Sequence, residues 1–150
     1  PYRVDIVDVT GARRSGAAIS YTALPVTVSD RNAWQDSTSH LHSTASTKGG
    51  GRGPNGAAPA FPDEAFPKLM PAFVAELVRV TPAGDIWVGR SHAITETSLS
   101  YDIFDGTGKR IGTARLKAHS TVVGFGAASV YVARQDPSTD LIHLEKYTVK

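Results

Sequence analysis

Residues 76–90 read ELVRVTPAGDIWVGR, which places two short apolar runs, 76–80 and 86–90, on either side of a five-residue polar segment. Pro82 presets the backbone of a turn, and Gly84 adopts a positive φ without steric penalty. Apolar runs of this length around such a turn are typical of two antiparallel strands. This stretch therefore predicts a β-hairpin and favours a fold built from antiparallel strands.

The same alternation of short apolar runs and glycine-containing turns extends over most of the chain. It predicts nine short strands, at 2–9, 17–24, 76–80, 86–90, 99–104, 110–116, 121–125, 129–134 and 141–149. Apart from the long segment 25–73, neighbouring runs are joined by turns too short for a crossover helix, so we expect an antiparallel meander. We predict an all-β protein whose 150 residues form a single domain.

Residues 25–73 differ in composition and are predicted to be a long, mostly irregular insertion within that domain. Ser, Thr, Gly, Ala and Pro dominate it, and the glycine-rich run 48–56 has too few apolar side chains to offset the entropy lost on ordering. Ser29 and Asp30 favour a helix cap, which predicts a short helix over about 31–37. Such a helix is marginal without a surface to pack on.

Large apolar side chains in this insertion are the candidate binding residues. Two of them lie in the segment 61–67, FPDEAFP, whose prolines predict extended chain rather than a sheet strand. The group either folds back over the sheet or forms an adhesive patch for another protein, because aromatic residues carry much of the energy at interfaces. The candidates are Trp34, Phe61, Phe66, Met70 and Phe73.

An internal repeat relates the two ends of the β region. Residues 4–11, VDIVDVTG, align with 101–108, YDIFDGTG, at a constant offset of 97, and Arg13 aligns with Arg110. Without the insertion, the offset is 48 residues, close to the ~40–50 residues of one four-stranded propeller blade. We interpret the two segments as the same hairpin used twice.

Composition excludes several classes of protein. There is no cysteine, which rules out disulfides, iron–sulfur clusters and a thiol nucleophile. The net charge is +2 and the basic residues are scattered, so we expect no nucleic-acid binding. No apolar run approaches the ~20 residues of a membrane-spanning helix.

No motif for catalysis or metal binding appears either. A Gly-x-Ser-x-Gly elbow is absent, and the glycine-rich run lacks the Lys-Ser/Thr ending of a phosphate-binding loop. Asp8 and Asp105 are explained by their turn positions, because an aspartate side chain accepts hydrogen bonds from backbone N–H groups of a turn. Trp87 lies in the apolar run 86–90, where the alternation of side chains along a strand places it either in the core or on a sheet face, and the core is favoured. We expect no enzymatic activity, no cofactor and no metal.

Four segments together resemble a known family: YRVDIVDVTGARR, LVRVTPAGDIWVGR, SYDIFDGTGKRIGTARL and VVGFGAASVYVARQDPSTDLIHLEKYTV. They resemble the C-terminal part of the bacterial six-bladed β-propeller proteins, which are related to the NHL and YWTD-like propellers. The resemblance covers residues 1–24 and 74–150. It implies propeller-type blades and, because the family is mostly exported, a periplasmic or extracellular location.

The chain holds about two such blades plus edge strands, whereas six blades need roughly 250–300 residues. Because 150 residues of this kind cannot close such a ring, we expect either further blades in a longer precursor or an open stack whose exposed edges are covered by partners. We predict a non-catalytic accessory subunit that docks, through its sheet edges and the aromatic-containing insertion, on other protein subunits. These would belong to a larger, membrane-bound periplasmic assembly, such as a respiratory or photosynthetic electron-transfer complex. The alternative is a fragment of a propeller enzyme or ligand-binding propeller whose central site needs the missing blades.

Overall fold

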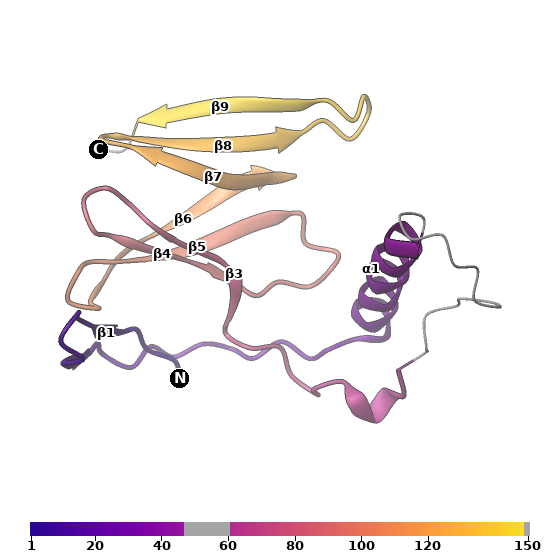
Figure 1. Ribbon diagram of the computed structural model, residues 1–150, viewed down its shortest axis with the longest axis horizontal. Coiled ribbons are helices and arrows are strands. Elements are labelled where there is room, and N and C mark those ends of the chain that lie inside the picture. The colour runs from indigo at the N-terminus through magenta and orange to yellow at the C-terminus, as the bar shows by residue number, and fades with distance from the viewer. Residues whose placement is uncertain (47–60, 149–150) are drawn as a thin grey trace. The chain divides into compact units, whose positions relative to one another are not determined.

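Nine strands, one α-helix and one turn of 3₁₀-helix make up the part of the chain that the computed structural model describes, residues 1–46 and 61–148 (Figure 1). The strands are β1 (Asp5–Val7), β2 (Arg13–Ser15), β3 (Phe73–Val80), β4 (Ile86–Arg90), β5 (Ser98–Phe104), β6 (Arg110–Ala118), β7 (Ser120–Gly126), β8 (Ser129–Gln135) and β9 (Ile142–Thr148). The helix α1 spans Val28–Ser46 and the 3₁₀ turn spans Asp63–Ala65. The predicted all-β class is confirmed.

The chain divides into two units, one of Leu24–Met70 and one that combines Pro1–Ala23 with Pro71–Lys150. The second of these contains all nine strands, which we call the β unit. Its sheets are β1-β2, β3-β4-β5-β6 and β7-β8-β9, and every pairing is antiparallel between neighbours in sequence. Figure 1 shows the β7–β9 sheet stacked on the four-stranded sheet.

The core of the β unit lies between the four-stranded and the three-stranded sheet. It is built from alternate residues of each strand, as expected for sheets that each bury one face. Trp87 is 6% exposed and its ring centroid lies 5.2 Å from that of Phe125, so its predicted core position is confirmed. The buried members of this core are Trp87, Tyr101, Val122, Val130 and Val132.

The two copies of the sequence repeat fold alike at their turns. Asp8 Oδ1 accepts hydrogen bonds from the backbone N–H and the hydroxyl of Thr10, at 2.8 and 2.6 Å. Asp105 Oδ1 accepts the same pair from Thr107 at the same distances. The strands then pair at equivalent positions, since the offset of 97 that relates the two copies also relates their first cross-strand pairs, Val7 with Arg13 and Phe104 with Arg110. The predicted turn role of both aspartates is confirmed.

The first hairpin differs from the prediction in its second strand. A strand was expected at 17–24, but β2 begins at Arg13, because the Asp8 turn closes at once through the hydrogen bond from Asp8 N to the Ala12 carbonyl, at 3.0 Å. Residues 17–24 contribute a single isolated bridge, that of Ile19 with Tyr2.

A close contact between the two copies of the repeat explains part of this difference. Gly16 N donates to the Val4 carbonyl oxygen at 2.9 Å. A Cβ at Gly16 would collide with the carbonyl oxygen of Gly108. Gly108 itself has a φ of +82°. The chain therefore leaves the ladder after Ser15 and packs its backbone directly on the turn of the second copy.

The insertion is more ordered at its start than predicted. The helix α1 begins at Val28 rather than near Arg31, because Thr27 and not Ser29 is its N-cap. It continues to Ser46, beyond the predicted end near Ser37. Thr27 Oγ1 accepts from Asp30 N at 3.2 Å, and Asp30 Oδ2 accepts from Thr27 N at 2.9 Å, which is a reciprocal capping box. The glycine-rich run 48–56 lies outside the described residues.

Two further expectations for the insertion are corrected. Residues 61–67 are not extended throughout, since Ala65 N donates to the Pro62 carbonyl at 2.9 Å and closes the 3₁₀ turn. Phe73 is the first residue of β3 and belongs to the β unit, whereas the compact unit of the insertion ends at Met70. The apolar run that opens at Phe73 continues as a strand, so its pairing with β4 decides where the insertion ends.

Candidate functional site

Three aromatic side chains of the Leu24–Met70 unit pack together, with a tryptophan at their centre. The Trp34 ring centroid lies 5.0 Å from that of Phe61 and 5.4 Å from that of Phe66. The interplanar angles are 73° and 87°, so both contacts are edge-to-face, the arrangement that aromatic quadrupoles favour. The rings form a cluster that we call the Trp34 cluster, consisting of Trp34, Phe61 and Phe66.

Local hydrogen bonds bring these residues together. The two ends of the unit are joined, since Val26 N donates to the Lys68 carbonyl at 3.0 Å and Met70 N donates to the Leu24 carbonyl at 2.8 Å. The capping box fixes where α1 starts and thus which helical position Trp34 occupies. Because the helix and the returning segment start from one closed base, the Trp34 side chain meets the two phenylalanines.

A hollow of about 550 Å³ lies against the Trp34 cluster. Six of its eight lining residues are apolar, and the two charged ones, Asp30 and Arg31, come from the first turns of α1. Trp34 is 48% exposed and Phe61 is 39% exposed, so the hollow opens to solvent on aromatic surface. The lining residues are Val26, Asp30, Arg31, Trp34, Phe61, Ala65, Phe66 and Pro67.

The structure brings together three of the five residues predicted to bind a partner. Met70 belongs to the same unit but does not line the hollow. Phe73 lies in the β unit, where its ring centroid is 6.3 Å from that of Tyr2. The contact of Trp34 with both phenylalanines inside the insertion is an arrangement that the sequence pattern did not indicate.

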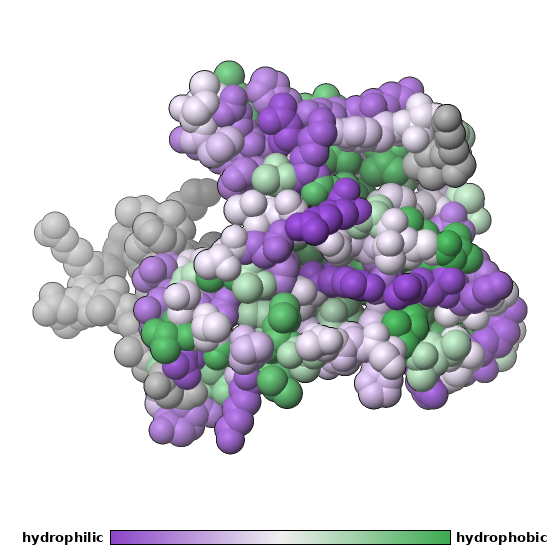
Figure 2. All heavy atoms as spheres, turned by 180° about the vertical axis from the view of Figure 1, so that it is seen from behind, coloured by the Kyte–Doolittle hydropathy of each residue, from purple (hydrophilic) through white to green (hydrophobic). Residues whose placement is uncertain are grey.

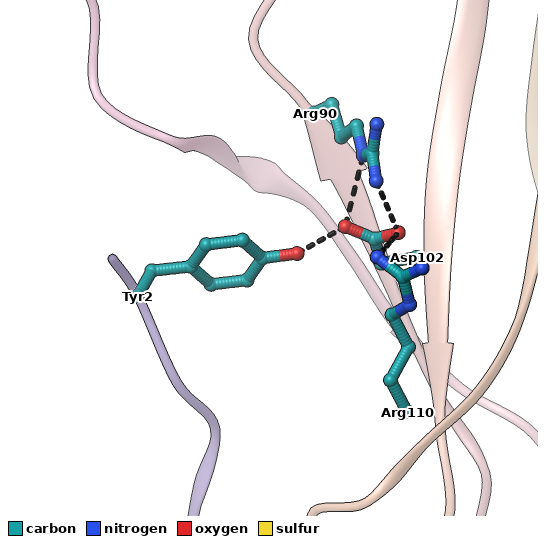
Figure 3. Close-up of polar contacts among 4 residues, drawn as sticks. All are labelled: Tyr2, Arg90, Asp102 and Arg110. Atoms are coloured by element: carbon teal, nitrogen blue, oxygen red, sulfur yellow. Dashed lines mark hydrogen bonds and ion pairs between the residues drawn. The ribbon is translucent and has the colours of Figure 1, made fainter. Parts of the chain in front are cut away.

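A buried carboxylate, Asp102, is the most highly connected charged group of the β unit (Figure 3). Arg90 donates to it twice, from Nε at 2.9 Å and from Nη2 at 2.8 Å, and Arg110 Nη1 lies 3.4 Å from Oδ1. The Tyr2 hydroxyl donates to Oδ2. Asp102 has no exposed surface. The cluster therefore joins β4, β5, β6 and the start of the chain.

Electrostatics keep this carboxylate charged. Burial acts to raise the pKa of Asp102, but hydrogen bonds from Arg90 and Tyr2 and the positive charges of Arg90 and Arg110 outweigh it and hold the pKa below its usual value. Burial and the hydrogen bond to Asp102 raise the pKa of Tyr2 above its usual value. Both groups keep one protonation state near neutral pH, so the cluster stabilises the fold and is not poised for acid–base chemistry.

The sequence carried a signal for this cluster that the prediction did not use. Asp5 and Arg13 of the first copy are ion-paired, as Asp102 and Arg110 of the second copy are. Both copies read Asp-Ile-x-Asp-x-Thr-Gly-x-Arg, at 5–13 and 102–110. The strand aspartate and the arginine eight residues later are therefore a repeated pair, whose aspartate is fully buried in the second copy and partly exposed in the first.

A second hollow, of about 410 Å³, lies between the two larger sheets. Core residues such as Trp87, Val130 and Val132 line it, and Tyr147 and Lys117 also line it. Figure 2 shows hydrophobic residues in the recess beneath the β7–β9 layer. Lys117 Nζ lies 3.9 Å from a carboxylate oxygen of Glu145, and Arg115 Nη2, also at this hollow, lies 3.1 Å from Glu96 Oε1. Both cations therefore already have an anionic partner.

Within residues 1–46 and 61–148, no three His, Asp or Glu side chains gather in a way that would bind a metal ion. The described helices include none with the length and apolar character needed to cross a membrane.

No family model, curated protein or solved structure matches this chain. The function is therefore inferred from the geometry of the Trp34 cluster, the Asp102 cluster and the sheet edges.

Proposed function

We propose that this chain is a non-catalytic interaction protein, a structural subunit that docks on other protein subunits. The observation that carries the proposal is the open apolar hollow at the Trp34 cluster, which has a half-exposed tryptophan in its wall. A concave apolar site with a few polar groups at its side is suited to an apolar side chain of a partner, and aromatic residues dominate the binding energy of such sites.

The energy available at this hollow is large enough to matter. Trp34 leaves 48% of its surface exposed. Covering about half of a residue of ~250 Å² at about 25 cal/mol per Å² corresponds to about 3 kcal/mol, or more than a hundredfold in affinity.

The β unit is proposed to be the scaffold that presents this site. A four-stranded meander stacked on a three-stranded one, and a hairpin motif that occurs twice, support propeller-type sheets in an open stack. Sheet edges that lack a neighbour are further places for other subunits to dock. The family resemblance supports only a periplasmic or extracellular location. As part of the same proposal, the host is a membrane-bound assembly on the periplasmic side, for which electron-transfer complexes are one example.

The test compares three forms of the protein in its source cells: the natural protein, Trp34→Ala and Leu69→Ala. Leu69 is the matched control, because it is 55% exposed and belongs to the same unit but does not line the hollow. We expect the natural protein and Leu69→Ala to co-purify with the same second polypeptide in fixed stoichiometry. We expect Trp34→Ala to lose it even at temperatures where circular dichroism shows that this variant is folded.

Equal retention of the partner by all three forms would contradict docking at the hollow. A melting temperature that falls for Trp34→Ala, with no change in association at temperatures where it is folded, would show that the cluster serves internal packing alone.

A further inference from the structure

The outer edge of β9 is a long strand edge without a neighbour in the described part of the chain. β9 pairs with β8 over all seven residues from Ile142 to Thr148, without a bulge. On its other side no described strand pairs with it. Because a strand bonds its neighbours alternately on two sides, about half of the backbone N–H and C=O groups of β9 point to this open edge.

The side chains of β9 divide between two faces of the sheet. Val130 and Val132 of β8 are buried in the core and pair with Tyr147 and Glu145. Residues directly opposite each other share a face, so the odd-numbered residues of β9 lie on the core side. The even-numbered residues, which include Ile142 and Leu144, lie on the outer face, where these two are 72% and 70% exposed.

The sequence of β9 suits antiparallel pairing with a second copy of itself. If a two-fold axis perpendicular to the sheet passes beside Leu144, then Leu144 faces Leu144 of the second copy. His143 then faces Glu145 of the second copy, and Ile142 faces the aliphatic stem of its Lys146. Each pair is an apolar contact or joins a carboxylate to a hydrogen-bond donor, which are the combinations that stabilise cross-strand pairs.

Neighbouring registers are less favourable. Shifting the axis by one residue toward the carboxyl end sets Glu145 against its own copy, and a shift by two sets Lys146 against its own copy. A shift of one residue the other way sets His143 against its own copy and separates it from Glu145. Like charges directly opposite each other destabilise a sheet, so the register centred on Leu144 is favoured.

The other long edges of the β unit, those of β3, β6 and β7, are protected against such pairing. The pairing of β7 with β8 has an irregular register between Val122 and Gly124, and such an irregularity disfavours pairing along the free edge. The pairing of β3 with β4 has an irregular register between Phe73 and Val78, and bulges of this kind twist an edge away from flat contact. The edge strand β6 carries Arg110, Arg115 and Lys117. Lysine and arginine along an edge disfavour pairing with a like strand. β9 has neither a bulge nor a run of like charge.

From this geometry we propose that β9 is a self-association edge: two copies of the chain pair their β9 strands antiparallel, centred on Leu144, and join two three-stranded sheets into one of six strands. The occupant of the edge is a second copy of this chain. This inference does not rest on the Trp34 cluster, because it uses residues of another unit and another kind of contact.

The experiment measures the mass of the 150-residue chain in solution by analytical ultracentrifugation over a range of concentrations. We expect a monomer–dimer equilibrium with a dimer mass of twice 15.9 kDa. Leu144→Lys and Leu144→Glu are each expected to weaken the dimer at least about tenfold, which corresponds to about 1.4 kcal/mol. Leu144 is mostly exposed, so both variants keep the folded state, which circular dichroism verifies.

Mixing the two variants tests the register itself. Residue 144 faces its own copy only in the proposed arrangement, so an equimolar mixture of Leu144→Lys and Leu144→Glu is expected to recover the dimer as a heterodimer. The matched control is Ile111→Lys on β6, since Ile111 is 53% exposed on an edge strand of the other sheet. This control is expected to dimerise as the natural chain does.

Three results would overturn the proposal. The first is a natural chain that stays monomeric at all concentrations. The second is a dimer that Ile111→Lys weakens and the Leu144 variants leave intact. The third is a mixture of the two Leu144 variants that stays monomeric while each variant alone is folded.

Discussion

Replacing Asp102 by asparagine removes the one negative charge that Arg90, Arg110 and Tyr2 share, with almost no change in shape. The introduced amide would offer one acceptor oxygen where the carboxylate offers two, and its NH₂ group would face a guanidinium donor. We therefore expect the free energy of unfolding to fall, because the arginines lose their counter-charge and one hydrogen bond from Arg90 is no longer made.

The size of the loss follows from burial. Breaking a buried ion pair by removing one partner costs about 3–5 kcal/mol. Asp102 has no exposed surface, but the side chains of Arg90 and Arg110 are 45% and 40% exposed and regain water when the charge is removed. We therefore expect the lower end of that range, about 3 kcal/mol, which at a urea dependence of about 2 kcal/mol per molar lowers the midpoint by about 1.5 M.

The assay is urea unfolding followed by tryptophan fluorescence, to which the buried Trp87 contributes, with Asp5→Asn as the matched control. Asp5 holds the equivalent place in the first copy of the repeat, where it pairs with Arg13 and lies 3.2 Å from Arg3 Nε. Both partners are mostly exposed, so Asp5→Asn is expected to shift the midpoint far less. Equal shifts for the two variants would refute the argument that burial sets the strength of the Asp102 cluster.

Acidification adds a second check with a defined sign. The pKa of Asp102 lies below its ordinary value of 3.8 in the folded protein. The unfolded chain therefore takes up its proton first, and the stabilisation is complete above pH 3.8 and is lost as the pH falls through the lower folded pKa. The difference in stability between the natural protein and Asp102→Asn is expected to shrink below about pH 4 and to stay constant from there to neutral pH. A difference that grows on acidification would contradict the sign of this pKa shift.

Three further outcomes follow from local contacts. Gly16→Ala places a Cβ against the backbone of Gly108 and is expected to lower the free energy of unfolding by about 1–3 kcal/mol. In the control Gly106→Ala, the added Cβ meets nothing within 4 Å, so little effect is expected. Equal urea midpoints for the two variants would contradict this expectation. Thr27→Ala removes the N-cap of α1, which is expected to lower the stability of the helix by about 1 kcal/mol and to reduce the helical circular dichroism signal. Ser29→Ala is expected to leave that signal unchanged. A larger loss of signal for Ser29→Ala than for Thr27→Ala would show that Ser29 is the cap. The pKa of Asp8, which accepts hydrogen bonds from a threonine hydroxyl and two backbone N–H groups, is expected below 3.8 in an NMR titration, and a value at or above 3.8 would contradict the turn geometry.

Most of the β unit could be predicted from the sequence, because its strands and turns are determined by residues that are close together in the chain. The strands β4, β5, β7 and β8 are short, mainly apolar runs, and the more polar strands β6 and β9 follow turns that contain an aspartate. These turn aspartates are recognisable in the sequence by the threonine or serine two residues later. The prediction of the second strand of the first hairpin was wrong, and the reason lies outside the local sequence. The length of this strand depends on the approach of Gly16 to Gly108, which lies 92 residues away in the chain.

The candidate site was only half predictable. Aromatic residues in a Pro- and Gly-rich insertion indicated a segment that binds other apolar surfaces. Which of these residues contact each other depends on the hydrogen bonds that join the two ends of residues 24–70. Phe73 was grouped with them by distance in sequence, whereas its strand pairing places it in the β unit. The Asp102 cluster was missed because the repeat was compared for its turns and not for the aspartate–arginine pair that both copies contain.

The measurement that tests the central proposal most directly is the composition of the assembly that contains this protein. Size-exclusion chromatography with mass spectrometry, on protein recovered from its source cells after extraction in mild detergent, reports every polypeptide and its ratio to this one. The account predicts co-elution with other subunits at fixed stoichiometry, and loss of at least one of them when Trp34 is replaced by alanine. Elution of the natural protein alone, with no second polypeptide at any detergent concentration that leaves membrane complexes intact, would contradict it.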